Sequence, residues 1–303
     1  MQLLRPIGDA LFTIWAVLTA VFFITHMLGD PVTLLLPVGA SQADLSLLRQ
    51  QMGLDLPIGM QYLRYVSGLF HGHLGDSFIF ARPAMSVVLE RLPATLELAL
   101  TALVLAILFG CTVGYVLAMG RGRAVSILRS LVVLAQATPV FILGFALILL
   151  FAVNLQTLPA GGRGGWRHLL LPAISMAIYL GAQIARVTES SIEQVTREPY
   201  ILTARMKGLR SSTIFSWYIL RNALFPVLTI LGILVGETLG GAVVVETVFA
   251  WPGIGRLTFQ AIQNGDIPLV SAAVLLSCIG VVLSNLSVDL LYLWLDPRTG
   301  RTT

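Results

Sequence analysis

The sequence predicts an all-α polytopic membrane protein with six transmembrane helices and with both termini in the cytoplasm. Hydrophobic residues make up 56% of the 303 residues and charged residues only 11%, whereas a soluble domain carries about 25% charged residues. Apolar runs long enough to cross a bilayer, which takes about 20 residues, recur along the chain. Lysines and arginines gather in alternate loops, and this pattern orients the helices.

Six apolar runs are expected to form the transmembrane helices. We place them at residues 10–28, 94–119, 130–153, 169–187, 224–246 and 270–294. The first run is longer than the core of a signal peptide, and no small-x-small cleavage site follows it, so we expect a membrane anchor. Pro93 and Pro172 are expected at helix starts, where the missing N–H costs nothing. Cys111 and Cys278 fall inside apolar runs and are expected to be small buried residues, not a disulfide or metal ligands.

The basic residues set the orientation. With the N-terminus inside, most of the 19 lysines and arginines fall on the cytoplasmic side, as is usual in membrane proteins. The short outer loops then hold only Arg163, Arg167 and Arg256. The net charge of +4 is therefore explained by topology and does not indicate a nucleic-acid partner.

Residues 29–93 are too polar to span a membrane and are expected to lie on the outer face. They are predicted to form two short amphipathic helices broken by Gly53 and Pro57. The same segment contains His71 and His73. Their spacing does not put them on one face of a helix, so ordinary loop histidines are favoured over a metal site.

Catalytic and nucleotide-binding motifs are missing from the sequence. It contains no HExxH and no GxSxG, and a Walker A loop needs a Gly-Lys-Ser/Thr ending. The only lysine, Lys207, is followed by Gly208 and Leu209. The glycine-rich loop 154–168 is likewise not expected to cradle a phosphate. We predict that the chain is not an enzyme and holds no metal or cofactor.

A few ionisable residues fall within or beside the predicted spans. Glu237 lies near the middle of the fifth span, and an acid there should face the bundle interior or a water-filled path. Two interpretations stay open for it: a lining of a translocation path, or a buried glutamate bonded to a neighbouring helix. Glu97, Glu246 and Asp289 lie near membrane boundaries, where anchoring or helix capping is expected.

Glycines recur at a spacing of four in two of the predicted spans. Small residues at this spacing permit close helix approach, so we expect packing sites. They are Gly110 and Gly114 in the second span, and Gly232, Gly236 and Gly240 in the fifth.

The stretch "EPYILTARMKGLRSSTIFSWYILRNALFPVLT", residues 198–229, is unusually basic for this chain. Glu198 and Pro199 predict a helix start, because an acid and a proline both suit the first helical turn. Gly208 predicts the end of that helix, since glycine accepts a positive φ at a helix C-terminus.

A second helix is expected to follow this glycine. Ser211 or Ser212 should cap it, and it should enter the fifth span near Pro226. The first helix combines apolar surface with positive charge. Its apolar residues are Tyr200, Ile201, Met206 and Leu209, and the basic ones around them are Arg205, Lys207 and Arg210. The spacing leaves two interpretations open: a helix on anionic lipid headgroups, or a docking site for a cytoplasmic protein.

This stretch resembles the EAA loop of inner-membrane permeases of ABC importers. It is most similar to the dipeptide, oligopeptide and nickel permease family, whose version reads roughly Tyr-x-x-Thr-Ala-Arg-Ala-Lys-Gly. The matching positions are Tyr200, Thr203, Ala204, Arg205, Lys207 and Gly208, and the family's Leu-Arg-Asn-Ala-x-x-Pro pattern adds Arg221, Asn222 and Pro226. Further segments match in order over nearly the whole chain, among them "RLPATLELAL", "TPVFILG", "GGAVVVETVFAWPGIG" and "DPRTG". Pro199, Met206 and Tyr218 depart from the family pattern.

The resemblance implies a non-catalytic permease with the type I ABC importer fold, in a bacterial inner (cytoplasmic) membrane. It implies a second homologous permease subunit, two cytoplasmic subunits that bind the ATP, and a periplasmic solute-binding protein. Short peptides are the expected substrate, while glutathione, opine-like compounds and nickel stay open. The loop would be a coupling helix, with Ala204 facing the ATPase closely.

The resemblance also divides the chain. Residues 1–28 would be a cytoplasmic tail and first span, 29–93 a periplasmic insertion, and 298–303 a cytoplasmic tail. The core would be 94–297, with a cytoplasmic coupling loop at 186–223. The alternative is a secondary transporter or channel that needs no ATPase, which would more often show broken helices in two repeated halves. The sequence shows no clear internal repeat.

Overall fold

The computed structural model describes residues 4–27, 41–70 and 74–295, which are mostly helical. The chain forms two compact units: Met1–Thr95 with Pro252–Val282, and Leu96–Trp251 with Leu283–Thr303. Each is considered by itself.

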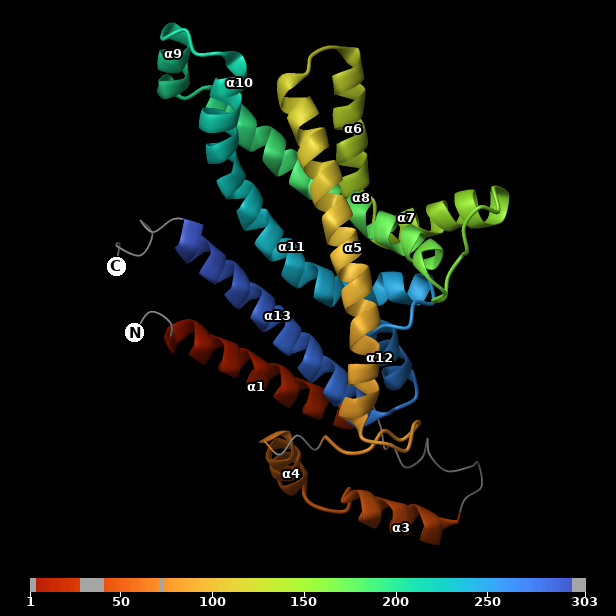
Figure 1. Ribbon diagram of the computed structural model, residues 1–303. Coiled ribbons are helices and arrows are strands. Elements are labelled where there is room, and N and C mark those ends of the chain that lie inside the picture. The colour runs from red at the N-terminus through yellow and green to blue at the C-terminus, as the bar shows by residue number, and fades with distance from the viewer. Residues whose placement is uncertain (1–3, 28–40, 71–73, 296–303) are drawn as a thin grey trace. The chain divides into compact units, whose positions relative to one another are not determined.

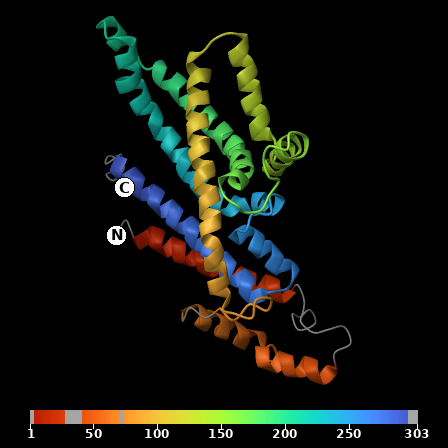
Figure 2. The same ribbon diagram turned by 45° about the vertical axis from the view of Figure 1, so that its right-hand side comes forward.

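The first unit brings the N-terminal helices together with a later helical hairpin (Figure 1). Its elements are α1 (Leu4–Met27), α3 (Gln42–Met52), α4 (Ile58–Phe70), the first part of α5 (Ala84–Met119), α12 (Ile254–Gln263) and the first part of α13 (Ile267–Leu295). The break between α3 and α4 was predicted: Gly53 has a φ of +68°, and α4 begins directly after Pro57. Figures 1 and 2 both show α1 running alongside the first part of α13.

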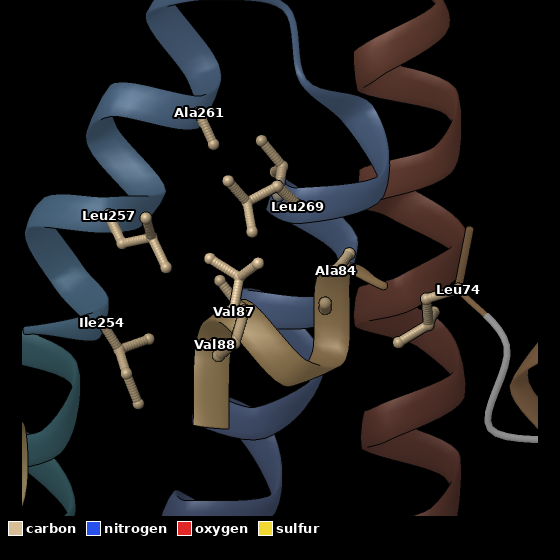
Figure 3. Close-up of a cluster of buried hydrophobic side chains, with 11 residues drawn as sticks. Leu74, Ala84, Val87, Val88, Ile254, Leu257, Ala261 and Leu269 are labelled. Atoms are coloured by element: carbon tan, nitrogen blue, oxygen red, sulfur yellow. The ribbon is translucent and has the colours of Figure 1, made fainter. Parts of the chain in front are cut away.

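A hydrophobic core joins α5, α12 and α13 in this unit. Val87 and Val88 of α5 are at most 1% exposed, and Ala261 of α12 and Leu269 of α13 are fully buried. Figure 3 shows these side chains converging. Helices α1 and α4 add aromatic contacts: the ring centroid of Phe22 in α1 lies 5.3 Å from those of Tyr62 and Tyr65 in α4, and Tyr65 also packs against this core.

A buried aspartate ties the turn before α5 to the start of α13. Asp266 is fully buried. One of its carboxylate oxygens accepts hydrogen bonds from the Ser77 hydroxyl at 2.5 Å and the Ile79 N–H at 3.2 Å. The other accepts from the Leu269 N–H at 3.2 Å, which is a helix cap for α13.

The second unit is arranged around α8. Its elements are the rest of α5, α6 (Arg123–Ala137), α7 (Val140–Leu147), the π-helix η1 (Ile148–Asn154), α8 (Trp166–Thr196), α9 (Pro199–Met206), α10 (Ser211–Thr213), the π-helix η2 (Ile214–Leu220), α11 (Arg221–Val248) and the end of α13. Helices α6, α7 and α11 all contact α8. In Figures 1 and 2 the turn between α5 and α6 lies at the same end of this unit as α9.

Two of the predicted glycine positions let α5 pack closely on α8. A β-carbon at Gly110 would lie 2.6 Å from the Ile184 β-carbon, and one at Gly114 would lie 2.5 Å from the backbone oxygen of Ala185. These distances are shorter than carbon atoms tolerate. The packing role predicted from the spacing of four is therefore confirmed for this pair.

The prolines correct several predicted boundaries. Pro93 and Pro172 lie inside α5 and α8, not at their starts, because burial of preceding residues such as Val87 and Leu171 offsets one lost hydrogen bond. Pro226 also lies inside α11. The predicted single span 130–153 is broken: α6 and the helix from Val140 meet at a bend of 109°. The break falls where Thr138 is extended, as expected before a proline.

Four helices of the described residues are long and apolar enough to cross a membrane. They are Ala84–Met119, Trp166–Thr196, Ser211–Thr238 and Ile267–Leu286, and the bent pair around Pro139 makes a fifth if it is one span. The apolar helix Leu11–Ile24 is shorter. An all-α membrane protein is thus confirmed, whereas six spans and cytoplasmic termini stay predictions. Cys111 and Cys278 are half-buried, not fully buried as expected.

Candidate functional site

The predicted helix after α8 is present. Glu198 is extended and Pro199 is the first residue of α9. The helix ends with backbone hydrogen bonds from Gly208 to Arg205 at 3.0 Å and from Leu209 to Ala204 at 3.3 Å. Gly208 has the predicted positive φ, +74°, which glycine adopts without strain.

The start of the next helix differs from the prediction. Arg210, not a serine, is the capping residue, and Ser211 is already the first helical residue. Neither Ser211 nor Ser212 makes a capping bond, because the backbone of Arg210 is the extended one (φ −64°, ψ 140°). From Ser211 the helix runs through η2 into α11 without a break.

One face of α9 is buried against its own chain. Ile201 and Ala204 are 1% and 4% exposed, and they pack in a cluster that we call the loop core. The loop core consists of Ile192 of α8, Ile201 and Ala204 of α9, Ile214 and Ile219 of η2, and Ala223 of α11. Residues three apart share a helix face. The predicted outward position of Ala204 and the predicted surface position of Ile201 are therefore wrong.

The opposite face of α9 is exposed and combines apolar and basic side chains. Leu202 is 61% exposed and Met206 is 74% exposed. Thr203, Arg205, Lys207 and Arg210 are also exposed. Leu202 was not singled out from the sequence, although its position two residues before Ala204 puts it on the other side of the helix.

Polar contacts fasten α9 and α8 to the following helices. The side-chain amide of Asn222 donates to the Tyr200 hydroxyl at 3.2 Å and to the Tyr218 carbonyl at 2.7 Å. The Ser191 hydroxyl donates to the Ala223 carbonyl at 2.9 Å. Partial burial, and then the nearby Glu198 carboxylate, raise the pKa of Tyr200, so this hydroxyl stays neutral at physiological pH.

A polar cavity of about 440 Å³ lies between α6, α8 and α11. We call it the inner cavity. Its lining consists of Gln136 from α6, Gln183, Arg186, Val187, Ser190, Ser191 and Gln194 from α8, and Pro226 and Ile230 from α11. The spacing of the polar residues on α8 would have shown one helix face in the sequence. The predicted loop 186–223 is helical up to Thr196, so Arg186 belongs to α8.

Glu237 is bonded to a neighbouring helix but is not buried. It is an exposed residue of α11, and its Oε1 accepts a hydrogen bond of 3.4 Å from the Tyr179 hydroxyl of α8. The buried alternative is therefore wrong, and the path-lining hypothesis stays open. Arg221 is exposed as well.

The remaining predicted acids have different surroundings. Glu97 forms an ion pair of 2.8 Å with Arg163, whose guanidinium lies 5.8 Å from the centre of the Trp251 ring. Glu246 is fully buried, and the side chain of Asp289 lies outside the described residues, as do His71 and His73. Among the described residues no group of three His, Cys, Asp or Glu side chains could hold a metal ion.

Comparisons with known proteins agree with this architecture. The family described as binding-protein-dependent transport system inner membrane component matches residues 106–301, and the family of the N-terminal part of such components matches residues 2–99. The probable D,D-dipeptide transport system permease protein of Escherichia coli (strain K12) is 41% identical over 92% of each chain. The glutathione transport system permease protein of Salmonella paratyphi A is 38% identical over 94% of each chain.

Solved structures share the fold at lower identity. The MetNI methionine ABC transporter in inward-facing conformations aligns with a TM-score of 0.59 at 19% identity, over 70% of this chain and 97% of that one. An amino acid ABC transporter with histidines aligns with a TM-score of 0.53 at 17% identity, over 68% of this chain and 92% of that one. The chain therefore belongs to the family of binding-protein-dependent transport system inner membrane components, and it is a non-catalytic permease subunit of an ABC importer.

Proposed function

We propose that this permease forms half of a translocation path for short peptides, or a related small solute, in a bacterial inner membrane. It works with a second homologous permease, two cytoplasmic ATP-binding subunits and a periplasmic solute-binding protein. The names of the relatives support the substrate class, since D,D-dipeptides and glutathione are both short peptides. The similarity to each relative extends over more than nine-tenths of both chains.

The proposed topology has six spans and both termini in the cytoplasm. Residues 1–28 form the N-terminal tail and first span, 29–93 a periplasmic insertion, 94–297 the core with its coupling loop at 186–223, and 298–303 the C-terminal tail. The arginine distribution supports this arrangement. Helix α9 lies at the same end of the second unit as the turn between α5 and α6, where Arg121 and Arg123 are found. This shared position of basic segments also supports the arrangement.

The single observation that carries the coupling role is the two-faced packing of α9. Its outer face presents apolar and basic side chains on the surface, and its inner face is buried in the loop core together with Ile192 of α8 and Ala223 of α11. A force on the outer face would reach both helices, because a close-packed core transmits displacement. ATP-driven closure of the ATPases would thereby move α8 and α11 and switch access to the path.

The proposed coupling loop includes the motif positions as well as the outer face of α9. They are Tyr200, Thr203, Ala204, Arg205, Lys207, Gly208, Arg221, Asn222 and Pro226. In this proposal Ala204 acts from inside the loop core, and Leu202 and Met206 contact the ATPase. Glu237 is proposed to line the translocation path.

Reconstitution tests the proposal. The permease is co-expressed with the second permease and the ATP-binding subunits encoded near it, purified through a tag, and placed in proteoliposomes with the binding protein. ATP-dependent uptake of a radiolabelled peptide is expected, with no ATP hydrolysis by the permease alone. Uptake that continues without the ATP-binding subunits would favour a secondary transporter or channel and would refute the proposal.

A further inference from the structure

An arginine and a glutamate in the second unit have no partner of opposite charge among the described residues. Nη1 of Arg186 donates a hydrogen bond of 2.9 Å to Oε1 of Gln136, and the guanidinium keeps further N–H donors. The Glu237 carboxylate accepts only the 3.4 Å bond from Tyr179 within this part of the chain. Both charged residues are exposed in the isolated subunit.

These charges lie on the helix faces that line the inner cavity. On α8 the face runs through Tyr179, Gln183, Arg186, Ser190 and Gln194, at intervals of three or four residues. On α11, Glu237 lies on the same face as Pro226 and Ile230, because it follows them by eleven and seven residues. The hydrogen bond between Tyr179 of α8 and Glu237 of α11 joins these two faces. Neither of the two residues lines the cavity itself.

Contact with lipid is energetically unfavourable for the side chain of Glu237, which lies near the middle of the fifth predicted span. A charged residue at the centre of a membrane helix costs about 2.5–3.5 kcal/mol even on the lowest scale. Such residues therefore face a water-filled path or a polar partner. The inner cavity supplies polar surroundings for Arg186, since amides and hydroxyls dominate the rest of its α8 lining, whereas Glu237 lies outside that lining. Its volume of about 440 Å³ also falls in the range of small-molecule sites, roughly 300–1,000 Å³.

We propose that Arg186 binds the carboxylate, and Glu237 the ammonium, of a short zwitterionic peptide on its way through the permease. Tyr179 and Arg186 are separated by about 10 Å along α8, and an extended peptide of two or three residues spans about 7–10 Å. The amides of Gln136 and Gln183 can donate to and accept from the peptide group. These contacts involve only the backbone and the two ends of the peptide. Selection between peptide side chains is therefore made by the binding protein. The inference rests on the proposed function.

Peptides with one end neutralised test the assignment. The probes are radiolabelled tri-L-alanine, its C-terminal amide and its N-acetyl derivative, and binding to the purified nucleotide-free complex is measured by equilibrium dialysis without the binding protein. Arg186→Gln should weaken tri-L-alanine binding roughly ten- to a hundredfold, the range for one charged hydrogen bond, and leave binding of the amide unchanged. Glu237→Gln should weaken tri-L-alanine binding similarly and leave binding of the N-acetyl form unchanged.

Matched variants separate binding from assembly. Arg186→Lys keeps the charge and should retain most of the tri-L-alanine affinity, and Arg121→Gln removes an exposed charge outside the inner cavity and should change nothing. If the transporter complex with Arg186→Gln does not assemble, the binding measured with Glu237→Gln and with Arg186→Lys tests the inference instead. Equal weakening of all three probes, or wild-type binding of tri-L-alanine no tighter than that of its derivatives, overturns the inference. Absence of ATP-driven uptake by the wild-type transporter contradicts the proposed function instead.

Discussion

Leu202 and Ala204 lie two residues apart on α9 and have opposite surroundings: Leu202 is 61% exposed, whereas Ala204 is 4% exposed and packs in the loop core. The family motif includes the alanine and not the leucine. The two positions therefore separate the folding of the coupling loop from its docking, and substitutions at them should have different consequences.

Leu202→Asp should impair docking without unfolding the loop. An exposed substitution changes stability by only about ±0.5 kcal/mol, so the membrane level of the permease should stay near normal. Copurification of the ATP-binding subunit and peptide uptake should both fall at least roughly tenfold, as expected for a central interface residue. Gln50→Asp on α3, also an exposed position, is the matched control. Normal copurification with Leu202→Asp would show that this face does not bind the ATPase.

Ala204→Asp should instead destabilise the permease itself. A carboxylate in the loop core would be buried without a partner, which costs several kcal/mol. The permease should therefore be lost from the membrane, or the loop should become sensitive to protease, before any effect on docking can be measured. Wild-type protein level and wild-type protease resistance would contradict the burial of Ala204.

Gly208 should tolerate asparagine better than alanine. Its φ is +74°, and a β-carbon there would contact nothing within 4 Å, so only backbone strain opposes substitution. Gly208→Ala should cost about 1 kcal/mol, and Gly208→Asn less, because asparagine enters the left-handed region more readily. Uptake and limited proteolysis of the loop should rank wild type, Asn, then Ala. The reverse order for Asn and Ala would argue against a left-handed turn.

Gly114→Ala should loosen the packing of α5 on α8. The added β-carbon would lie 2.5 Å from the Ala185 backbone oxygen, and overpacking of this kind costs about 1–3 kcal/mol. Thermal inactivation of the detergent-solubilised transporter should shift to lower temperature. Gly59→Ala in α4 is the control, since its β-carbon would meet nothing within 4 Å and alanine favours a helix. Equal behaviour of the two variants would contradict the close approach.

Asp266→Ala should be more harmful than Ser77→Ala. The first change leaves the Ser77 hydroxyl and the N–H groups of Ile79 and Leu269 without their acceptor, and each buried donor left unpaired costs about 1–3 kcal/mol. The second removes the bond to Asp266 together with its donor, and it leaves only the Phe80 N–H, which donates to the Ser77 hydroxyl at 3.2 Å, without its acceptor. Fluorescence-detected size exclusion after heating should rank wild type, Ser77→Ala and Asp266→Ala in decreasing stability. Equal loss for both would show that the Ser77 bond dominates.

Much of the candidate coupling loop could be predicted from local sequence. Pro199 at a helix start and a positive φ at Gly208 depend on backbone chemistry that these residues carry wherever they occur. The predicted surface position of Ile201 failed, because the side of a short helix that becomes buried depends on η2 and α8. The predicted serine caps were also wrong, because Arg210 adopts the extended backbone of a capping residue and both serines are already helical.

The sequence by itself determined the membrane class, the helical character of the chain and the breaks at Gly53 and Gly208, because composition, apolar run length and glycine geometry are local properties. It also indicated that Gly110 and Gly114 contact another helix, since residues that are four positions apart lie on the same face of a helix. Only the tertiary structure decided that Ala204 points inward and that the polar face of α8 lines a cavity. Those facts depend on which surfaces meet, and residues far apart in the chain, such as Gln136 and Arg186, meet only in the folded protein.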